Sequence, residues 1–278
     1  MSFSNTCALM MAACWAGAAN AQLQLLPDRE AQRVFSGQAR NISVVWRNAG
    51  GQVFDNEIGA RMFQASSATV VSLGLQRWKE LKVLPGQTIL ESAPLDFPAV
   101  KAETTFLVQW LDGTNRIIGT TEVLAYPTNL LHELKQLVNE SWNNLGVLDP
   151  MNQLKPALKH EATGFADLAE SELDAFSGKL AVVGLCGPDD PEWNGLADRI
   201  RTLAQKGTPV VWIQGPPRKR EKIRPSFYVV PQYRAAVVVV QPGLVADLAD
   251  NPQSQLNLIY FCKLALRPES PALPNQSH

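Results

Sequence analysis

The stretch that decides the fold is "KLAVVGLCGPDDPEWNGLADRIRTLAQKGTPVVWIQ", residues 179–214. An apolar run of strand length comes first, apolar residues at three- and four-residue steps follow, and a second apolar run ends the stretch. Gly207 stands where the helical pattern stops, as is common at helix C-termini. This order predicts two parallel strands joined by a crossover helix. The expected buried stripe of the helix is Trp193, Leu196, Ile200 and Leu203.

The same kind of unit recurs on both sides of this stretch. "LGVLD" (145–149) precedes it, and "FYVVPQ" (227–232) and "AAVVVVQ" (235–241) follow as further apolar runs. Such continuous apolar strands are typical of a sheet covered on both faces. With the helical "SQLNLIYFCKLAL" at 254–266, they predict an α/β domain over residues 146–267 that contains a mostly parallel, doubly wound sheet. We expect the Pro- and Ser-rich residues 268–278 to be a disordered tail.

The N-terminal half has a different period. Apolar and polar residues alternate in short runs separated by turn residues, which is the pattern of half-buried antiparallel strands. The spacing predicts an all-β sandwich over residues 22–127. The expected inward-facing sets are Ile42, Val44 and Trp46; Ile58, Ala60 and Met62; and Phe106, Val108 and Trp110.

A helical pattern follows at Pro127. Leu131, Leu134, Val138 and Trp142 recur at three- and four-residue steps in "TNLLHELKQLVNESWNNLG". Asn129 is a candidate N-cap, and Gly146 is the expected stop. We therefore predict a linker helix over residues 128–145.

The first 21 residues predict export. They carry no charged side chain, have an apolar centre in "CALMMAACWAGAA", and end in Ala19-Asn20-Ala21, a small-x-small cleavage pattern. The apolar run is too short for a comfortable membrane span, which needs about 20 residues. Two alternatives stay open: a buried amphiphilic N-terminal helix, or "MAAC" as a lipoprotein box with Cys14 acylated after cleavage. The expected localisation is periplasmic or extracellular.

Composition and missing motifs exclude several classes of function. With 25 basic and 26 acidic residues, the chain is neither a polyanion binder as a whole nor an acidic tail. It holds no cysteine and histidine cluster with zinc spacing, and we expect no metal site and no cofactor. It also has no G-x-G-x-x-G, Walker lysine or G-x-S-x-G motif. Once the leader is removed, Cys186 and Cys262 remain, either as thiols or as one disulfide.

Residues 167–185, "DLAESELDAFSGKLAVVGL", and 193–214, "WNGLADRIRTLAQKGTPVVWIQ", resemble class I glutamine amidotransferase-like domains, which have a flavodoxin-like layout. The resemblance implies a cysteine nucleophile in a tight strand-to-helix turn, activated by a later histidine and an acid. Cys186 matches the nucleophile. The chain departs from the pattern because Pro188 stands in place of a glycine and His278 is the first histidine after Cys186. Residues 39–125 resemble immunoglobulin- or fibronectin-like sandwiches in pattern.

Cys186 therefore has two interpretations. It is either a catalytic thiol or a small residue packed under the carboxyl edge of the sheet. The resemblance together with the missing histidine favours the second interpretation, that of a catalytically degenerate domain.

Two charged groups are candidate binding residues. Asp189 and Asp190 either hold a cation or act as a base, or else cap the following helix. In "GPPRKREKIRP" (215–225) the basic side chains either receive an anion, such as an acidic glycan or a phosphate group, or form a solvated connection between strands. The loop lacks the interleaved aromatic residues expected of a nucleic-acid site. The basic residues are Arg218, Lys219, Arg220, Lys222 and Arg224.

These observations predict an exported, non-catalytic binding or structural protein of the bacterial cell envelope. Its contact with a protein, or with an anionic glycan or phosphate ligand, is expected at the carboxyl edge of the α/β sheet or on the sandwich. The alternative is a hydrolase or amidase that acts on envelope glycans or small amides through Cys186. The sequence specifies neither the ligand nor the oligomeric state.

Overall fold

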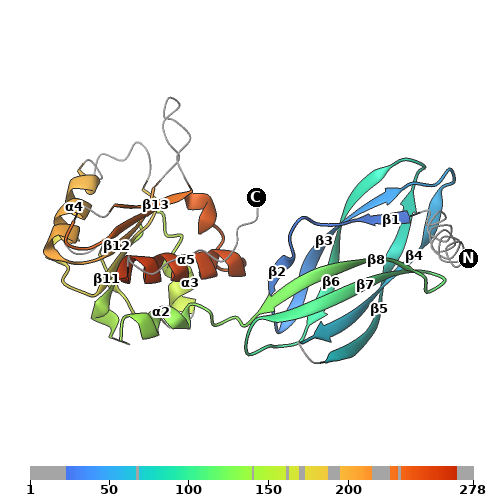
Figure 1. The fold of residues 1–278 in the computed structure, drawn as a ribbon, viewed down its shortest axis with the longest axis horizontal. Helices are drawn as coiled ribbons and strands as arrows, with labels where there is room; N and C mark the ends of the chain where they lie inside the picture. The colour runs from blue at the N-terminus through green and yellow to red at the C-terminus, as the bar shows by residue number, and fades with distance from the viewer. Residues whose placement is uncertain are drawn as a thin grey trace, which may run out of the picture. The chain divides into compact units, whose positions relative to one another are not determined.

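The computed structural model describes residues 23–66, 69–139, 141–160, 163–168, 173–186, 195–214, 226–230 and 233–267. The chain divides into two compact units, Met1–Thr128 and Asn129–His278. Figure 1 shows strands throughout the described part of the first unit and a sheet with helices in the second. An all-β N-terminal part followed by an α/β part with a mostly parallel sheet was predicted, and this coarse fold class is confirmed.

The described part of the first unit contains two sheets. One has the order β1-β3-β6 and the other β2-β8-β7-β4-β5. Neighbouring strands are antiparallel in both sheets, except that β2 and β8 are parallel. The strands are β1 (Leu23–Leu26), β2 (Gln32–Phe35), β3 (Gln38–Asn48), β4 (Phe54–Ala65), β5 (Val70–Val83), β6 (Thr88–Phe97), β7 (Thr104–Asp112) and β8 (Ile117–Tyr126).

One core lies between these two sheets. Alternate side chains of each strand point into it, and the three inward-facing sets predicted from the alternation are all buried. Trp46 of β3 meets Trp110 of β7 edge to face, with ring centroids 5.7 Å apart. The Trp110 indole Nε1 donates a hydrogen bond to Thr121 Oγ1 at 2.9 Å, so this polar atom is satisfied inside the core.

The second unit is built on a six-stranded sheet of order β10-β9-β11-β12-β14-β13. Five strands are parallel, and β13 pairs antiparallel with β14 at the edge of the sheet. The strands are β9 (Leu145–Leu148), β10 (Ala166–Asp167), β11 (Leu180–Val183), β12 (Val210–Ile213), β13 (Phe227–Val230) and β14 (Val237–Val240).

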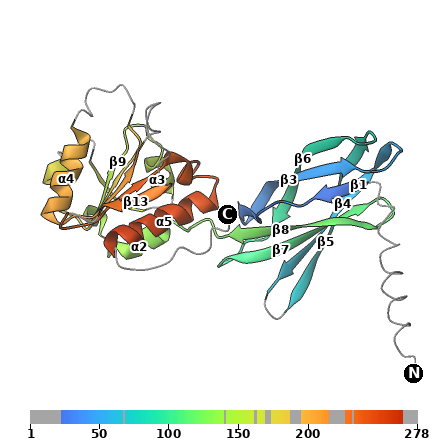
Figure 2. The same cartoon turned by 45° about the horizontal axis from the view of Figure 1, so that its top comes forward.

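Helices cover both faces of this sheet (Figure 2). Residues of α2 (His132–Leu137), α3 (Lys155–His160) and α5 (Pro252–Leu266) share one core cluster with the sheet, and residues of α4 (Leu196–Lys206) share the cluster on the other face. Short 3₁₀ turns lie at Trp142–Asn144, Leu173–Ala175 and Pro242–Leu244. Two covered faces explain why the strands are apolar along their whole length.

The predicted linker helix over residues 128–145 is wrong in extent and in role. The α2 helix ends at Leu137, Asn139 takes a positive φ of 62°, and Gly146 lies inside β9 rather than at a helix end. Asn144 Nδ2 donates to Val138 O at 2.7 Å, so this carbonyl accepts from a side chain instead of from a backbone amide of a further helical turn. The buried residues Leu131, Leu134 and Val138 belong to the core of the α/β unit, so this segment is part of that domain.

The α4 helix also begins later than the sequence suggested. It starts at Leu196 after Gly195, whose φ of 96° is left-handed, so Gly195 and not Asp190 is its N-cap. Its predicted end at Gly207 is confirmed by a C-cap φ of 103°. Leu196, Ile200 and Leu203 are buried as expected, and Trp193 lies outside the described residues.

Candidate binding site at the carboxyl edge of the sheet

The direction in which the chain adds strands to the sheet reverses between β9 and β11. From β9 the chain moves outward to β10, and it then returns past β9 to β11 on the other side. Open α/β sheets bind ligands outside the carboxyl ends of their strands at such a point. The residues that immediately follow these two strands are Asp149 and Gly184.

Asp149 is buried, with 2% of its surface exposed, and its carboxylate is fully engaged with the backbone. Asp149 Oδ1 accepts from Gln153 N at 3.1 Å, and Oδ2 accepts from Leu154 N at 2.7 Å and Lys155 N at 2.9 Å. These amides lead into α3, so the side chain joins the end of β9 to the start of that helix. Asp149 was not among the predicted site residues. Its only local signal is an acid directly after an apolar run.

Gly184 brings the end of β11 against the end of β9. Its N–H donates to Leu148 O at 2.7 Å. A Cβ atom at this position would lie 2.9 Å from Asp149 Oδ1 and 3.2 Å from Leu148 O, so only glycine fits without a shift. Gly184 therefore has a packing role, since it lets the ends of β9 and β11 approach closely.

Cys186 lies at this edge, two residues beyond Gly184. It is partly buried and packs against the core cluster on the α4 face, and its Sγ lies 3.8 Å from Gly184 O. Neither Cys186 nor Cys262 is in a disulfide. Cys262 lies on α5 in the core cluster of the other face, where burial raises the pKa of its thiol to about 12. The two cysteines thus belong to different sides of the sheet.

Two glutamines continue the carboxyl edge beyond β11. Gln214 follows β12 and its N–H donates to Val240 O, while the N–H of Gln241, after β14, donates to Ser226 O, both at 2.9 Å. Gln214 and Ser226, which flank residues 215–225 in the chain, therefore both lie at this edge. The predicted binding residues themselves lie outside the described residues; they are Asp189, Asp190, Arg218, Lys219, Arg220, Lys222 and Arg224.

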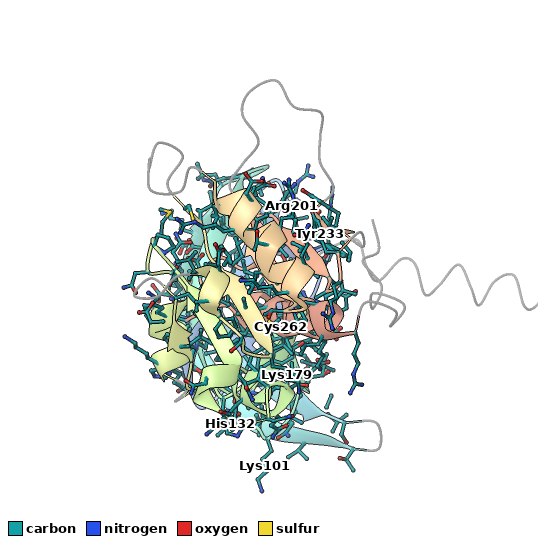
Figure 3. All side chains as sticks on the ribbon, turned by 90° about the vertical axis from the view of Figure 1, so that its left-hand side faces the viewer. Lys101, His132, Lys179, Arg201, Tyr233 and Cys262 are labelled. Carbon is teal, nitrogen blue, oxygen red and sulfur yellow. The ribbon has the colours of Figure 1, made fainter. Side chains whose placement is uncertain are left out.

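The two histidines of the described chain belong to helices on the opposite face of the sheet from Cys186, because α2 and α3 share the core cluster of one face and Cys186 packs against that of the other. The α3 helix starts beside Asp149, and the exposed His160 is its last residue. His132 is the first residue of α2. Its neighbour Glu133 pairs with Lys263 in the last turn of α5 at 2.6 Å, and Leu137 O accepts from Lys179 Nζ just before β11. Figure 3 shows His132 and Lys179 on the α2 side of the unit.

The described residues contain no group of three or more histidine, cysteine or acidic side chains arranged to hold a metal ion. Within those same ranges, none of the helices has the length and apolar character required to cross a membrane.

Comparisons with known proteins assign no family. No family model and no curated protein matches the chain. The similar solved structures include the alkylpurine DNA glycosylase AlkC of Pseudomonas fluorescens, bound to DNA with an abasic site analogue (TM-score 0.30, 11% identity, 38% of this chain and 31% of that one). They also include the sporulation control protein Spo0M of Bacillus subtilis (0.30, 9%, 43% and 55%) and a β-glucosidase of Listeria innocua in complex with isofagomine (0.28, 10%, 38% and 16%). The matched regions span little more than half of each of these proteins at most, and likenesses this low carry no argument about function.

Proposed function

We propose that the chain is an exported, non-catalytic binding or structural protein of the bacterial cell envelope. In this proposal its contact surface is the carboxyl edge of the α/β sheet, around Cys186, Gln214 and Gln241. The ligand or partner is anionic, because the five basic residues between Arg218 and Arg224 belong to the connection that starts and ends at this edge.

The strand order supports a flavodoxin-like assignment for the α/β unit. Numbered along the chain without the antiparallel β13, its five parallel strands have the order 2-1-3-4-5, which is that of flavodoxin-like sheets. The two packed sheets of the first unit, with one core between them, support an immunoglobulin-like assignment at the level of architecture. Both assignments agree with a degenerate amidotransferase-like domain carried on an accessory sandwich.

The observation that carries the non-catalytic proposal is the separation of the histidines from Cys186. A cysteine nucleophile needs a base within hydrogen-bond reach, about 3 Å. His132 and His160 belong to α2 and α3, whose buried residues share the core cluster on one face of the sheet, whereas Cys186 packs against the cluster on the other face.

Thiol alkylation distinguishes the proposed function from a cysteine hydrolase. In the mature chain that begins at Gln22, which lacks Cys7 and Cys14, iodoacetamide labelling of the folded protein at pH 7 reports on Cys186, because Cys262 is completely buried. We expect Cys186 to react no faster than glutathione under the same conditions, and Cys186→Ala to abolish the labelling. A rate at least tenfold above that of glutathione would contradict the proposal and favour the hydrolase, since an activated thiolate reacts fast at neutral pH.

Binding is tested with polygalacturonate as an anionic glycan and with inorganic phosphate. We expect charge removal at Arg218, Lys219 and Arg220 together to weaken the binding of one of these anions by at least tenfold, whereas Arg199→Gln on α4 leaves it unchanged. If neither anion binds at low salt, or if the triple variant binds as well as the native chain, the carboxyl edge is not an anion site.

Export makes a separate prediction about the N-terminus of the mature chain. Cleavage after Ala21 yields a protein that begins at Gln22, and mass spectrometry of the envelope fraction measures this directly. A mature chain that begins with an acylated Cys14 would instead support the lipoprotein alternative, and an intact Met1 in the cytoplasm would exclude export.

A further inference from the structure

A cavity of about 450 Å³ lies in the α/β unit on the side away from the carboxyl edge. Its walls come from the end of α2, the residue before β11 and the last two turns of α5. This volume falls in the range of small-molecule sites, roughly 300–1,000 Å³. The lining residues are Leu137, Lys179, Tyr260, Lys263, Leu264, Leu266 and Arg267.

Among the described residues that line the cavity, three side chains are cationic and none is acidic. Lys263 pairs with Glu133 at 2.6 Å, so its charge is compensated. Lys179 Nζ has neutral acceptors instead, Leu137 O at 2.8 Å and Asn139 Oδ1 at 3.1 Å. Within the described ranges the Arg267 guanidinium has no hydrogen-bond or ion-pair partner, and its residue is exposed. In the described part of the chain, the Lys179 and Arg267 charges at the rim therefore have no counter-charge.

The remaining wall is apolar. Leu137 of α2 faces the cavity together with Leu264 and Leu266 of α5, and Tyr260 adds an aromatic ring. Cations near the C-terminal end of a helix also interact favourably with its dipole, which accounts for Lys263 in the last turn of α5 and for Arg267 at its C-cap. The dipole does not account for Lys179, which comes from a different segment and meets the same cavity.

From this combination we infer a second binding site, which takes a small monocarboxylate with an aliphatic chain. The chain lies against the three leucines and displaces water from them, and the carboxylate receives charge-assisted hydrogen bonds from Arg267 and Lys179. A neutral molecule of the same shape would leave both positive charges without a counter-charge. The site is distinct from the carboxyl edge and does not depend on the function proposed there.

Decanoate is the probe, decanol is its neutral match, and the protein is the full chain. Calorimetric titration gives the affinity, and methyl and aromatic NMR shifts of Leu264 and Tyr260 locate the bound molecule. We expect saturable decanoate binding with a Kd of roughly 1 mM or tighter. Arg267→Gln should weaken it about tenfold, because one charge-assisted hydrogen bond is lost. The matched control Arg199→Gln removes an exposed arginine of α4 and should leave the Kd unchanged.

A second variant protects the test against an unfolded protein. Leu264→Trp fills a partly exposed lining position and should abolish binding while the far-UV circular dichroism stays native. The inference is overturned if decanoate fails to saturate, if decanol binds equally well, or if Arg267→Gln and Arg199→Gln have the same Kd. It is also overturned if the shifts map to the exposed apolar residues Val71, Leu73 and Leu75 of β5.

Discussion

Replacing Asp149 by alanine measures how strongly its carboxylate joins the end of β9 to the start of α3. The carboxylate is the acceptor for three backbone amides, and the Leu154 residue that supplies one of them is buried. A buried amide without an acceptor costs about 1–3 kcal/mol. Because three amides at the start of α3 lose this acceptor together, we expect a total near the upper end of this range, about 3 kcal/mol.

Hydrogen–deuterium exchange with mass spectrometry suits this chain, because the two units need not unfold together. In the Asp149→Ala variant, amides of β9 and α3 should exchange about 100-fold faster, which corresponds to about 3 kcal/mol. Asp149→Asn keeps one carbonyl oxygen and should lose only about 1 kcal/mol. Peptides of the first unit should be unaffected by either variant.

The matched control is Asp198→Ala on α4. Asp198 forms an exposed ion pair with Arg201 at 2.8 Å, and exposed pairs contribute about 0–1 kcal/mol. If Asp149→Ala costs no more than this control, the three amides find other acceptors and Asp149 does not hold β9 to α3.

Two further predictions concern packing and pH. Gly119→Ala places a Cβ 2.5 Å from Leu25 Cβ and should lower the free energy of unfolding of the first unit by about 1–3 kcal/mol, as measured by urea titration. The control Gly51→Ala should change this free energy little, because no atom lies within 4 Å of the added Cβ. Equal effects of the two variants would refute the close approach of Gly119 to Leu25. For Cys262, folding raises the pKa from 9.0 to about 12, so its contribution to stability is complete below pH 9 and is lost as the pH rises toward 12. Cys262→Ala should therefore flatten the fall in stability over this interval, and an unchanged pH profile would contradict the assignment.

The spacing of apolar residues predicted most strands correctly, because burial of one or both faces of a strand fixes which of its residues are apolar. Trp46 and Trp110 were expected in the core since alternate residues of a strand share a face, and both are completely buried. The apolar runs at β11, β12 and β14 predicted central strands for the same reason. The helix predicted after Pro127 was too long, because a helical stripe of apolar residues does not reveal whether local asparagine hydrogen bonds end the helix early.

The carboxyl edge could be predicted as a site only in outline. Chain order alone places Cys186 after a strand, and this position was anticipated correctly. Asp149 was missed because its importance rests on three amides that follow it and on the close approach of Gly184. Such contacts form only when two strand ends meet in the folded sheet.

By itself, the sequence determined the number and kind of the two domains, the residues of their cores and the exclusion of common catalytic motifs. These features depend on local periodicity and composition, which each segment carries within itself. Only the tertiary structure decided that β9 and β11 form the point of reversal, that the histidines lie away from Cys186, and that Lys179 and Arg267 meet at one cavity. Those relations join residues far apart in the chain, so no local pattern encodes them.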